Sequence, residues 1–305
     1  MTSAKKMSFK KSRDIPIYLM ILPALLLIIL FNYIPIYGVS MAFIDFSPYR
    51  GIFRSEWLGF KNFAYFLTDD NFWRVMRNTI IINFYQLLYG FPVPVIFAIM
   101  LNELSMRKYK KFIQTVSYLP HFISWVVAAG IVSAVLSPAG GLVNNVIKGL
   151  FSMEPIYFLA KEKYFRTIIV ASNIWKGFGM SAVYYLAVLS SIDPEYYEAA
   201  RIDGAGRMRQ IWHITLPGIK TIAIVLLILQ IGNMTTIGFE QIFLLYNPMV
   251  YNVGDVISTY TYRLGIEQLR YSLTTAIGFT QSIVNFIMVY SANVLSRKIA
   301  GWALW

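Results

Sequence analysis

The sequence predicts an all-α integral membrane protein in which six transmembrane helices cross the bilayer and both termini are cytoplasmic. Three observations predict this class. The 305 residues are 57% hydrophobic and only 14% charged, whereas a soluble domain usually carries about a quarter charged residues. The apolar residues gather in runs near the roughly 20 residues that a helix needs to cross a bilayer. The basic residues behind the net charge of +12 lie in short clusters between these runs, a pattern that sets membrane topology.

The composition also excludes several classes of function. The chain has no cysteine and only two histidines, which excludes a thiolate nucleophile and a metal site built on sulfur or on a histidine cluster. The basic residues are not gathered on one polar domain, so we expect no nucleic-acid partner. No phosphate-binding loop of the Gly-x-x-x-x-Gly-Lys-Ser/Thr type occurs. We therefore predict no catalytic residues, no metal and no enzymatic activity in this chain.

The predicted spans follow one another closely along the chain. A basic cytoplasmic tail, 1–14, precedes an apolar run that is too long for a cleaved signal peptide. The six spans are expected near 15–41, 78–101, 115–136, 165–190, 218–237 and 272–295. Prolines within the first three predict kinks that face protein rather than lipid. The membrane domain covers 15–297, and a short tail, 298–305, ends the chain.

The distribution of Lys and Arg orients these spans. If the N-terminus is inside, the basic clusters of the tail, of 107–111 and of 201–220 all lie on the cytoplasmic side. The outer segments 42–71, 137–163 and 239–271 are nearly balanced in charge. The segment 137–163 contains a short amphipathic stretch from Leu142 to Leu150, and 239–271 is polar and aromatic.

The cytoplasmic loop 191–217 is the most informative segment. Asp193 is a good N-cap and Pro194 suits the first helical position, so a short helix is expected to begin there. Gly204 or Gly206 can take the left-handed conformation that ends this helix. A small-residue face flanked by charges suits docking on another protein, although a solvated loop with helical turns has a similar pattern.

The spacing within this loop resembles a family signature. Glu198-Ala199-Ala200, three residues, Gly204, nine residues and Ile214-x-Leu216-Pro217 are similar to the signature of binding-protein-dependent ABC importer permeases of type I. Further stretches resemble maltose-type carbohydrate-uptake permeases, closest to those for oligosaccharides and polysaccharide fragments. These stretches are 58–63, 77–79, 118–120 and 141–144.

The resemblance implies a function and a set of partners. The loop 193–215 would form the coupling helix, with the docking residues Glu198, Ala199, Ala200, Asp203, Gly204, Ile214, Leu216 and Pro217. The chain would pair with a second homologous permease, two ATP-binding subunits and an extracellular or periplasmic solute-binding protein. It would translocate an oligosaccharide across the bacterial cytoplasmic membrane. ATP and magnesium would bind to the partner ATPase, and this chain would bind no cofactor.

The expected solute pathway lies in the fourth and fifth spans. The polar interruption Asn173-Ile-Trp175-Lys176-Gly177 is similar to a stretch whose Asn and Gly lie at the sugar site of maltose-type permeases. Gly177 would let a solute approach the backbone, and Lys176 should face a cavity, a carboxylate or the interface. Gln230 and Asn233 of the fifth span are further candidates. Helix packing remains an alternative for each of these residues, and Tyr184 and Tyr185 are expected to be packing or interfacial residues.

Two other functions fit the sequence less well. The signature is shared by all such importers, so a peptide or a polyamine is an alternative solute. An ion-coupled secondary transporter would usually need membrane-embedded carboxylates, and no acidic residue lies deep in a predicted span.

Overall fold

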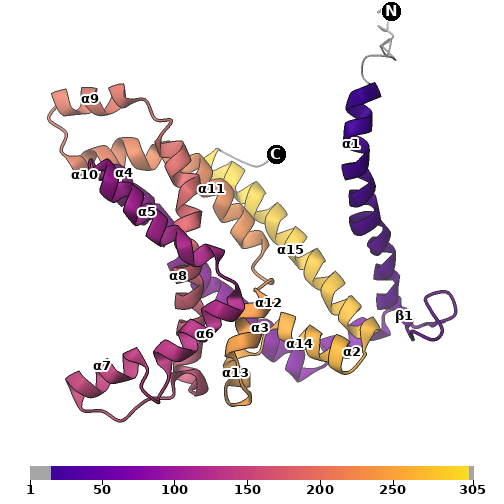
Figure 1. The fold of residues 1–305 in the computed structure, drawn as a ribbon. Coiled ribbons are helices and arrows are strands. Elements are labelled where there is room, and N and C mark those ends of the chain that lie inside the picture. Colours follow the sequence, from indigo (N-terminus) through magenta and orange to yellow (C-terminus); the bar gives the residue numbers. More distant parts are fainter. Residues whose placement is uncertain (1–14, 302–305) are drawn as a thin grey trace, which may run out of the picture.

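The computed structural model describes residues 15–301, which are almost entirely helical (Figure 1). The predicted tail 1–14 and residues 302–305 of the predicted C-terminal tail lie outside the described residues. Two short strands, β1 (Ile44–Asp45) and β2 (Glu56–Trp57), pair antiparallel with Ile44 opposite Trp57. The helical class predicted from the sequence is therefore confirmed.

Four segments in the described chain are long and apolar enough to cross a membrane, namely Tyr18–Phe43, Asp70–Glu103, Arg207–Gly232 and Tyr271–Lys298. The first segment is built from α1 (Ile15–Ile28), η1 (Ile29–Tyr33) and η2 (Ile34–Phe43), and the second from α3 (Asp70–Tyr85), η3 (Gln86–Gly90) and α4 (Pro92–Glu103). The third is built from α10 (Arg207–Gln210), η5 (Ile211–Thr215) and α11 (Leu216–Gly232). The fourth lies in α15 (Tyr271–Ala300). The helix α8 (Glu162–Leu189) has 28 residues and is less apolar than these four segments.

The predicted third span, 115–136, is not one straight helix. It is divided between α5 (Arg107–Phe122) and α6 (Trp125–Leu136), which meet at 105°. Pro120 cannot donate a backbone hydrogen bond. Ser124 then starts a new helix by accepting a hydrogen bond from the Val127 N–H with its side chain. The sequence predicts a kink within one span. The structure shows a sharper break, so α5 and α6 count as one span only if the bent pair is taken as a single crossing.

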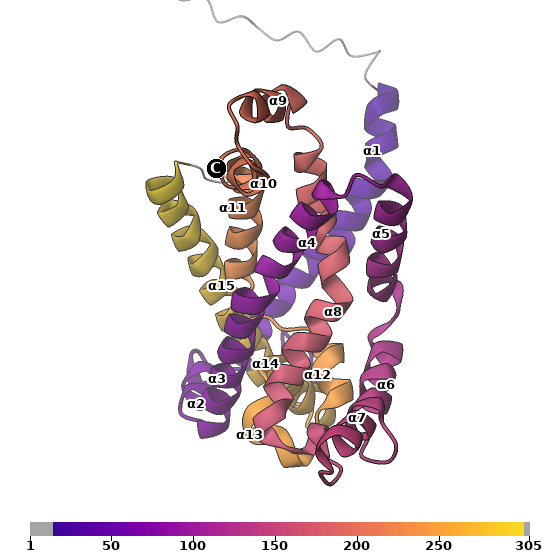
Figure 2. The same cartoon turned by 90° about the vertical axis from the view of Figure 1, so that its left-hand side faces the viewer.

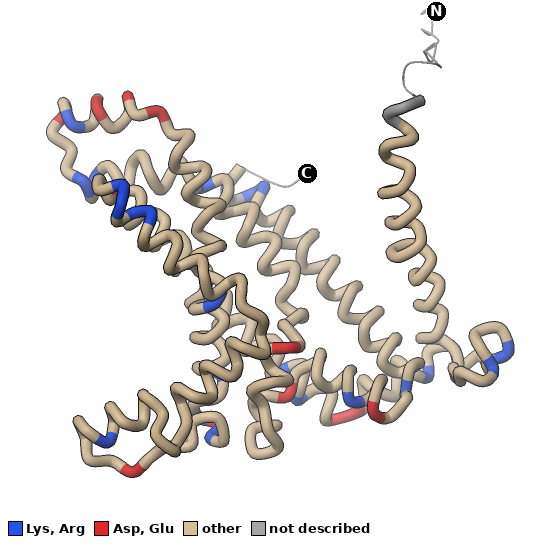
Figure 3. The backbone as a smooth tube through the Cα atoms, in the orientation of Figure 1, with Lys and Arg blue, Asp and Glu red and all other residues tan. Residues whose placement is uncertain are grey.

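The shorter elements gather at the two ends of the long helices (Figure 1, Figure 2). The helix α9 (Pro194–Ile202) and α10 lie at one end, together with the start of α1 and the end of α15; we call this the α9 end. The opposite end holds the hairpin and the elements α2 (Lys61–Leu67), α7 (Leu142–Phe151), η4 (Phe158–Ala160), η6 (Pro248–Val250), α13 (Tyr251–Gly254), α14 (Ile257–Tyr262) and η7 (Arg263–Glu267). Charged residues concentrate at both ends (Figure 3).

The helix α8 is the centre of the bundle, since it packs against α4, α5, α11 and η3. A side chain at Gly179 of α8 would collide with the backbone of Ser117 in α5, so these two helices are in close contact. Between α8, α4 and α11, the buried residues Ala98, Ala182 and Ile219 form one core cluster. The helix α1 stands apart from this bundle and exposes its apolar side chains.

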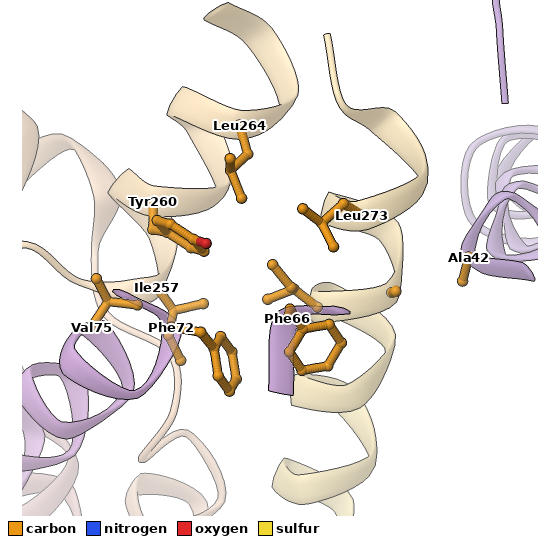
Figure 4. Close-up of a cluster of buried hydrophobic side chains, with 10 residues drawn as sticks. Ala42, Phe66, Phe72, Val75, Ile257, Tyr260, Leu264 and Leu273 are labelled. Atoms are coloured by element: carbon orange, nitrogen blue, oxygen red, sulfur yellow. The ribbon is translucent and has the colours of Figure 1, made fainter. Parts of the chain in front are cut away.

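A second core lies at the end opposite α9 (Figure 4). Phe66 of α2 and Phe72 of α3 pack with their ring centroids 4.7 Å apart. Ile257 and Tyr260 of α14 and Leu273 of α15 are buried in the same cluster. This packing joins segments that are about 200 residues apart in the sequence.

Buried polar groups cross-link the same end. Asp255 has 0% exposure and accepts hydrogen bonds from Arg263 Nη2 at 2.6 Å and Thr259 Oγ1 at 2.8 Å. Asn78 of α3 is equally buried and donates to the backbone carbonyls of Asp255 and Asn252 at 3.0 and 2.9 Å. We refer to Asn78, Asp255, Thr259 and Arg263 as the polar clamp.

Candidate functional site

The loop 191–217 folds as its local sequence predicts. The Asp193 side chain accepts a hydrogen bond from the Glu195 N–H at 3.0 Å and caps α9, with Pro194 in the first position. Gly204 has φ +73°, and the Ala205 N–H bonds back to the Ala200 carbonyl at 2.8 Å. A left-handed residue that ends a helix in this way is usually glycine. The predicted cap and the predicted glycine corner are therefore both confirmed.

Few side-chain contacts join the two arms of this loop. The Tyr197 hydroxyl of α9 lies 3.1 Å from the Thr215 hydroxyl of η5. Gln210 is buried and donates to the Ala205 carbonyl at 2.8 Å. A cavity of about 820 Å³ lies between the loop and the end of α4, with Glu198, Arg201 and Arg207 in its lining.

The loop presents both polar and apolar groups outward. Of the predicted docking residues, Glu198, Ala199, Asp203, Gly204 and Pro217 are exposed, and Ala200, Ile214 and Leu216 are half-buried. Large apolar side chains accompany them, with exposures of 65% for Tyr196, 86% for Ile202, 67% for Met208 and 62% for Trp212. Exposed apolar groups gathered on a charged loop are typical of a surface that another protein covers.

A second site lies within the bundle. A cavity of about 240 Å³ opens between α8, η3, α4 and α11. Three of the predicted pathway residues, Asn173, Gly177 and Gln230, line it. The other lining residues are Gln86, Gly90, Phe91, Pro94, Ile174, Phe178, Ser181, Tyr184, Tyr185 and Leu226. We call this space the central cavity.

The lining of the central cavity mixes polar and apolar groups and carries no charged side chain among the described residues. It combines the amides of Gln86, Asn173 and Gln230 with the phenols of Tyr184 and Tyr185. The Gln86 Nε2 atom is buried and has no hydrogen-bond partner in the described chain. A buried donor without a partner costs about 1–3 kcal/mol.

A hydrogen bond to Gln241 fixes the Asn173 side chain. Its Nδ2 donates to Gln241 Oε1 at 3.1 Å. Gln241 is fully buried on α12 (Phe239–Leu245) and donates in turn to the Ile169 carbonyl at 2.7 Å and to Ser172 Oγ at 2.9 Å. This chain fixes the Asn173 amide and leaves its carbonyl oxygen without a protein partner among the described residues. Asn173 can therefore accept a hydrogen bond from a hydroxyl group in the cavity.

The structure places the other three predicted pathway residues elsewhere. Lys176 Nζ donates to the His121 carbonyl at 3.0 Å and lies 5.4 Å from the centre of the Trp125 ring, so it binds the end of α5. Trp175 lines a separate apolar hollow between α6 and α8. Asn233 is exposed at the end of α11, where it donates to the Leu229 carbonyl at 2.9 Å.

Sequence reasoning missed several residues of the central cavity. Gln86 interrupts an apolar run, which is a detectable signal, but nothing local places it opposite Asn173. Ser181 and Tyr184 follow Gly177 by four and seven residues and so share its helix face. Tyr184 and Tyr185 were expected to serve packing or the interface, and both line the cavity.

Comparisons with known proteins agree with this architecture. A family model described as "Binding-protein-dependent transport system inner membrane component" matches residues 63–301. The "Polygalacturonan/rhamnogalacturonan transport system permease protein YteP" of Bacillus subtilis (strain 168) is 42% identical over 96% of this chain and 91% of that protein. The crystal structure of a bacterial ABC transporter involved in the import of the acidic polysaccharide alginate contains a chain with 42% identity and a TM-score of 0.87. That match covers 94% of this chain and 96% of that one. A crystal structure of a bacterial alginate ABC transporter in complex with an alginate pentasaccharide-bound periplasmic protein gives 40% identity and a TM-score of 0.87, over 96% of this chain and 97% of that one.

Proposed function

This chain belongs to the family of binding-protein-dependent transport system inner membrane components, and we propose that it is a permease subunit that moves an oligosaccharide across the bacterial cytoplasmic membrane. The observation that carries the choice of solute is the central cavity. Its amides and phenols match the neutral hydroxyl groups of a sugar, and the buried Gln86 donor lacks a partner in the described chain. A polyamine would need carboxylates, and none lines this cavity among the described residues.

The proposed partners follow from the family and from the α9 end. We propose that the exposed face of α9 and α10 docks on one of two ATP-binding subunits, which bind ATP and magnesium. This chain binds no cofactor itself. A second, homologous permease closes the pathway, and a solute-binding protein delivers the oligosaccharide to the opposite end of the bundle. Rocking of the helices would expose the cavity alternately to the two sides.

We also propose six crossings, with both termini in the cytoplasm. This reading counts α8 and the bent pair α5–α6 as one crossing each, and places the α9 end inside. It is supported by the start of α1 and the end of α15, which lie at the same end of the molecule as α9 (Figure 1).

Cysteine labelling tests this topology, because the native chain has no cysteine. Ile202→Cys in α9 should react with a membrane-impermeant maleimide only from the cytoplasmic side, and Leu150→Cys in α7 only from outside. Both side chains are exposed, at 86% and 72%, whereas Asn144, the natural choice by sequence, is buried and makes four hydrogen bonds. Labelling of both positions from one side would contradict the six-span arrangement.

The function itself is tested by uptake into proteoliposomes that contain the assembled importer. Asn173→Leu should lower oligosaccharide uptake by about tenfold, since a sugar hydroxyl would lose a hydrogen bond in a site closed to water. Asn233→Leu is the matched control, because it makes the same change at an exposed amide outside the cavity. Equal uptake by the two variants would remove the central cavity from the pathway.

A further inference from the structure

Two arginines, Arg77 in α3 and Arg166 in the first turns of α8, form no ion pair in the described chain. Both ion pairs in the described chain use one acid, Asp255, which Arg263 approaches at 2.6 Å and Arg74 at 3.9 Å. Arg77 and Arg166 have no carboxylate oxygen within the 4.0 Å of an ion pair among residues 15–301. We propose that Arg77 and Arg166 form a carboxylate-binding subsite, so that the importer selects oligosaccharides that carry uronic acids. This inference rests on the proposed function and names its substrate class.

The two guanidinium groups are held by Asn78 of the polar clamp and by the neighbouring carbonyls of Asn252 and Val253. Arg166 Nη2 donates to Asn78 Oδ1 at 2.8 Å, and Arg166 Nε donates to the Val253 carbonyl at 3.3 Å. Arg77 Nη2 donates to the Asn252 carbonyl at 3.4 Å, the same oxygen that accepts from Asn78. The two charges lie close enough to repel each other. Keeping two like charges side by side costs free energy that a bound anion would recover.

The neighbouring acid, Glu162, attracts the Arg166 charge but forms no ion pair with it. The Glu162 Oε1 atom accepts a hydrogen bond from Asn252 Nδ2 at 3.0 Å. No ion pair joins Glu162 to either arginine in the described part of the chain. With the three acids Asp69, Glu162 and Asp255 counted against the four arginines Arg74, Arg77, Arg166 and Arg263, the group keeps an excess of one positive charge. An arginine fork binds a carboxylate through two parallel hydrogen bonds, which a lysine does not do.

An aromatic hollow adjoins the central cavity on the side of α8 that leads toward Arg166. Arg166 precedes Asn173 by seven residues of α8, which places it on the same helix face, about 10 Å nearer the outer end. This hollow has a volume of about 430 Å³ and is lined by Tyr85, Tyr89, Val170, Ala171, Ile174 and Thr167, the residue that follows Arg166. Ile174 also lines the central cavity. Tyrosine faces stack against sugar rings, so a chain of several sugar units can occupy the hollow with one carboxylate at the arginines.

Lys176 is the cation that sequence alone associates with an anionic solute, and its contacts argue against that role. Its ammonium group binds the His121 carbonyl and the face of Trp125, and it does not line the central cavity. Selection of charge is therefore expected at the outer arginines, and selection of hydroxyl groups at Asn173 and Gln86.

Direct binding to the assembled importer tests the subsite. The probes are fluorescently labelled trigalacturonate and its fully methyl-esterified form, which share one backbone and differ in charge. Binding is measured in nanodiscs of zwitterionic lipid without the binding protein, so that capture upstream does not contribute. Wild type should prefer the acid, and the preference should fall as the salt concentration rises. Arg77→Gln and Arg166→Gln should each reduce the preference by about tenfold and leave binding of the ester within about twofold.

Two further variants separate a binding role from a structural one. Arg54→Gln removes an exposed arginine from the turn between β1 and β2 and should leave the preference unchanged. Arg166→Lys keeps the charge and should retain part of the preference. If Arg77→Gln and Arg166→Gln weaken both probes equally, or neither, the arginines are structural and the subsite is overturned. If wild type binds the ester and the acid alike, the subsite fails while the proposed sugar function stands. If wild type binds neither probe, the subsite is overturned, and the uptake of the Asn173→Leu variant decides the proposed function separately.

Discussion

The two ends of α8 are built by opposite means. At the α9 end, the helix continues into a loop whose arms are joined by the contacts Tyr197–Thr215 and Gln210–Ala205, and which exposes Ile202 almost completely. At the other end, the polar clamp ties α3, α13 and α14 to one another and to α8 through Arg166. The loop at one end exposes large apolar side chains, and at the other end a buried carboxylate, that of Asp255, is paired with Arg263.

This difference assigns a mechanical role to each end. A segment with few buried contacts opens or shifts at low free-energy cost, whereas a segment held by a buried hydrogen-bond network moves as part of the fold. The exposed side chains of α9 gain partners only when another subunit covers them. We infer that the α9 end depends on its docking partner for its final position. The opposite end, which holds the polar clamp and which we call the clamped end, provides the stable frame for the pathway.

The largest effect is expected where the clamp is broken. Asp255→Asn removes the carboxylate that Arg263 and Arg74 share. Breaking a buried pair by removing one partner costs about 3 kcal/mol or more, because a cation is left without compensation. Thermal unfolding of the purified importer should therefore begin several degrees lower. Glu267→Gln, an exposed acid at the same end, is the control, and an equal loss of stability in both variants would contradict the clamp.

An intermediate effect is expected at the glycine corner. Gly204 has φ +73°, and no atom lies near the position where a side chain would begin. Gly204→Val therefore introduces backbone strain of about 1–2 kcal/mol without a steric clash, and it should misalign α9 relative to α10. The ATPase activity stimulated by the loaded binding protein should fall while the complex still assembles.

Gly206 provides the matched control for this prediction. Its φ is −68°, which valine adopts freely, and it also has open space around it. Gly206→Val should retain most of the stimulated ATPase activity. Equal activity in the two variants would show that coupling does not depend on the shape of this corner.

The sequence predicts the α9 end well because its signals are local. Asp193, Pro194 and Gly204 determine a cap, a first turn and a corner within twelve residues, and no distant contact is needed. The central cavity is predicted in part, since Asn173, Gly177 and Gln230 interrupt apolar runs. Gln86 is not predicted as a cavity residue, because its position opposite Asn173 depends on how η3 packs on α8.

The clamped end and the bent pair are the least predictable parts. Asp255 and Asn78 lie 177 residues apart, so no periodicity relates them. Pro120 signals a kink, but the 105° angle between α5 and α6 depends also on the cap at Ser124 and on Lys176, which binds the freed His121 carbonyl from another helix. A charged lysine within an apolar span would be unfavourable if it faced lipid. The ammonium group of Lys176 instead contacts a backbone carbonyl and the face of Trp125.

The smallest effect is expected at the edge of the clamped end and concerns pH. The Asp69 carboxylate caps α3 and accepts hydrogen bonds from the Tyr260 hydroxyl at 2.5 Å, the Asn71 N–H at 2.9 Å and Asn71 Nδ2 at 3.0 Å. Burial raises the pKa of Asp69, but these hydrogen bonds outweigh it and hold the pKa below its usual value of 3.8. A carboxyl with a lowered pKa in the folded state stabilises the fold above its unfolded pKa. The stabilisation is lost as the pH falls through the folded pKa.

Asp69→Asn should therefore be slightly less stable than wild type at pH 6–8, by less than about 1 kcal/mol, because asparagine also caps helices and still accepts from Tyr260. This difference should shrink as the pH falls below about 4, where the wild-type carboxyl becomes protonated. Thermal unfolding of the two proteins between pH 3 and pH 8 measures it. Asp70→Asn removes the same charge from the next residue and separates the effect of charge from that of the three hydrogen bonds. A stability difference that grows on acidification would reverse the sign of the linkage and remove Asp69 from the network that stabilises the clamped end.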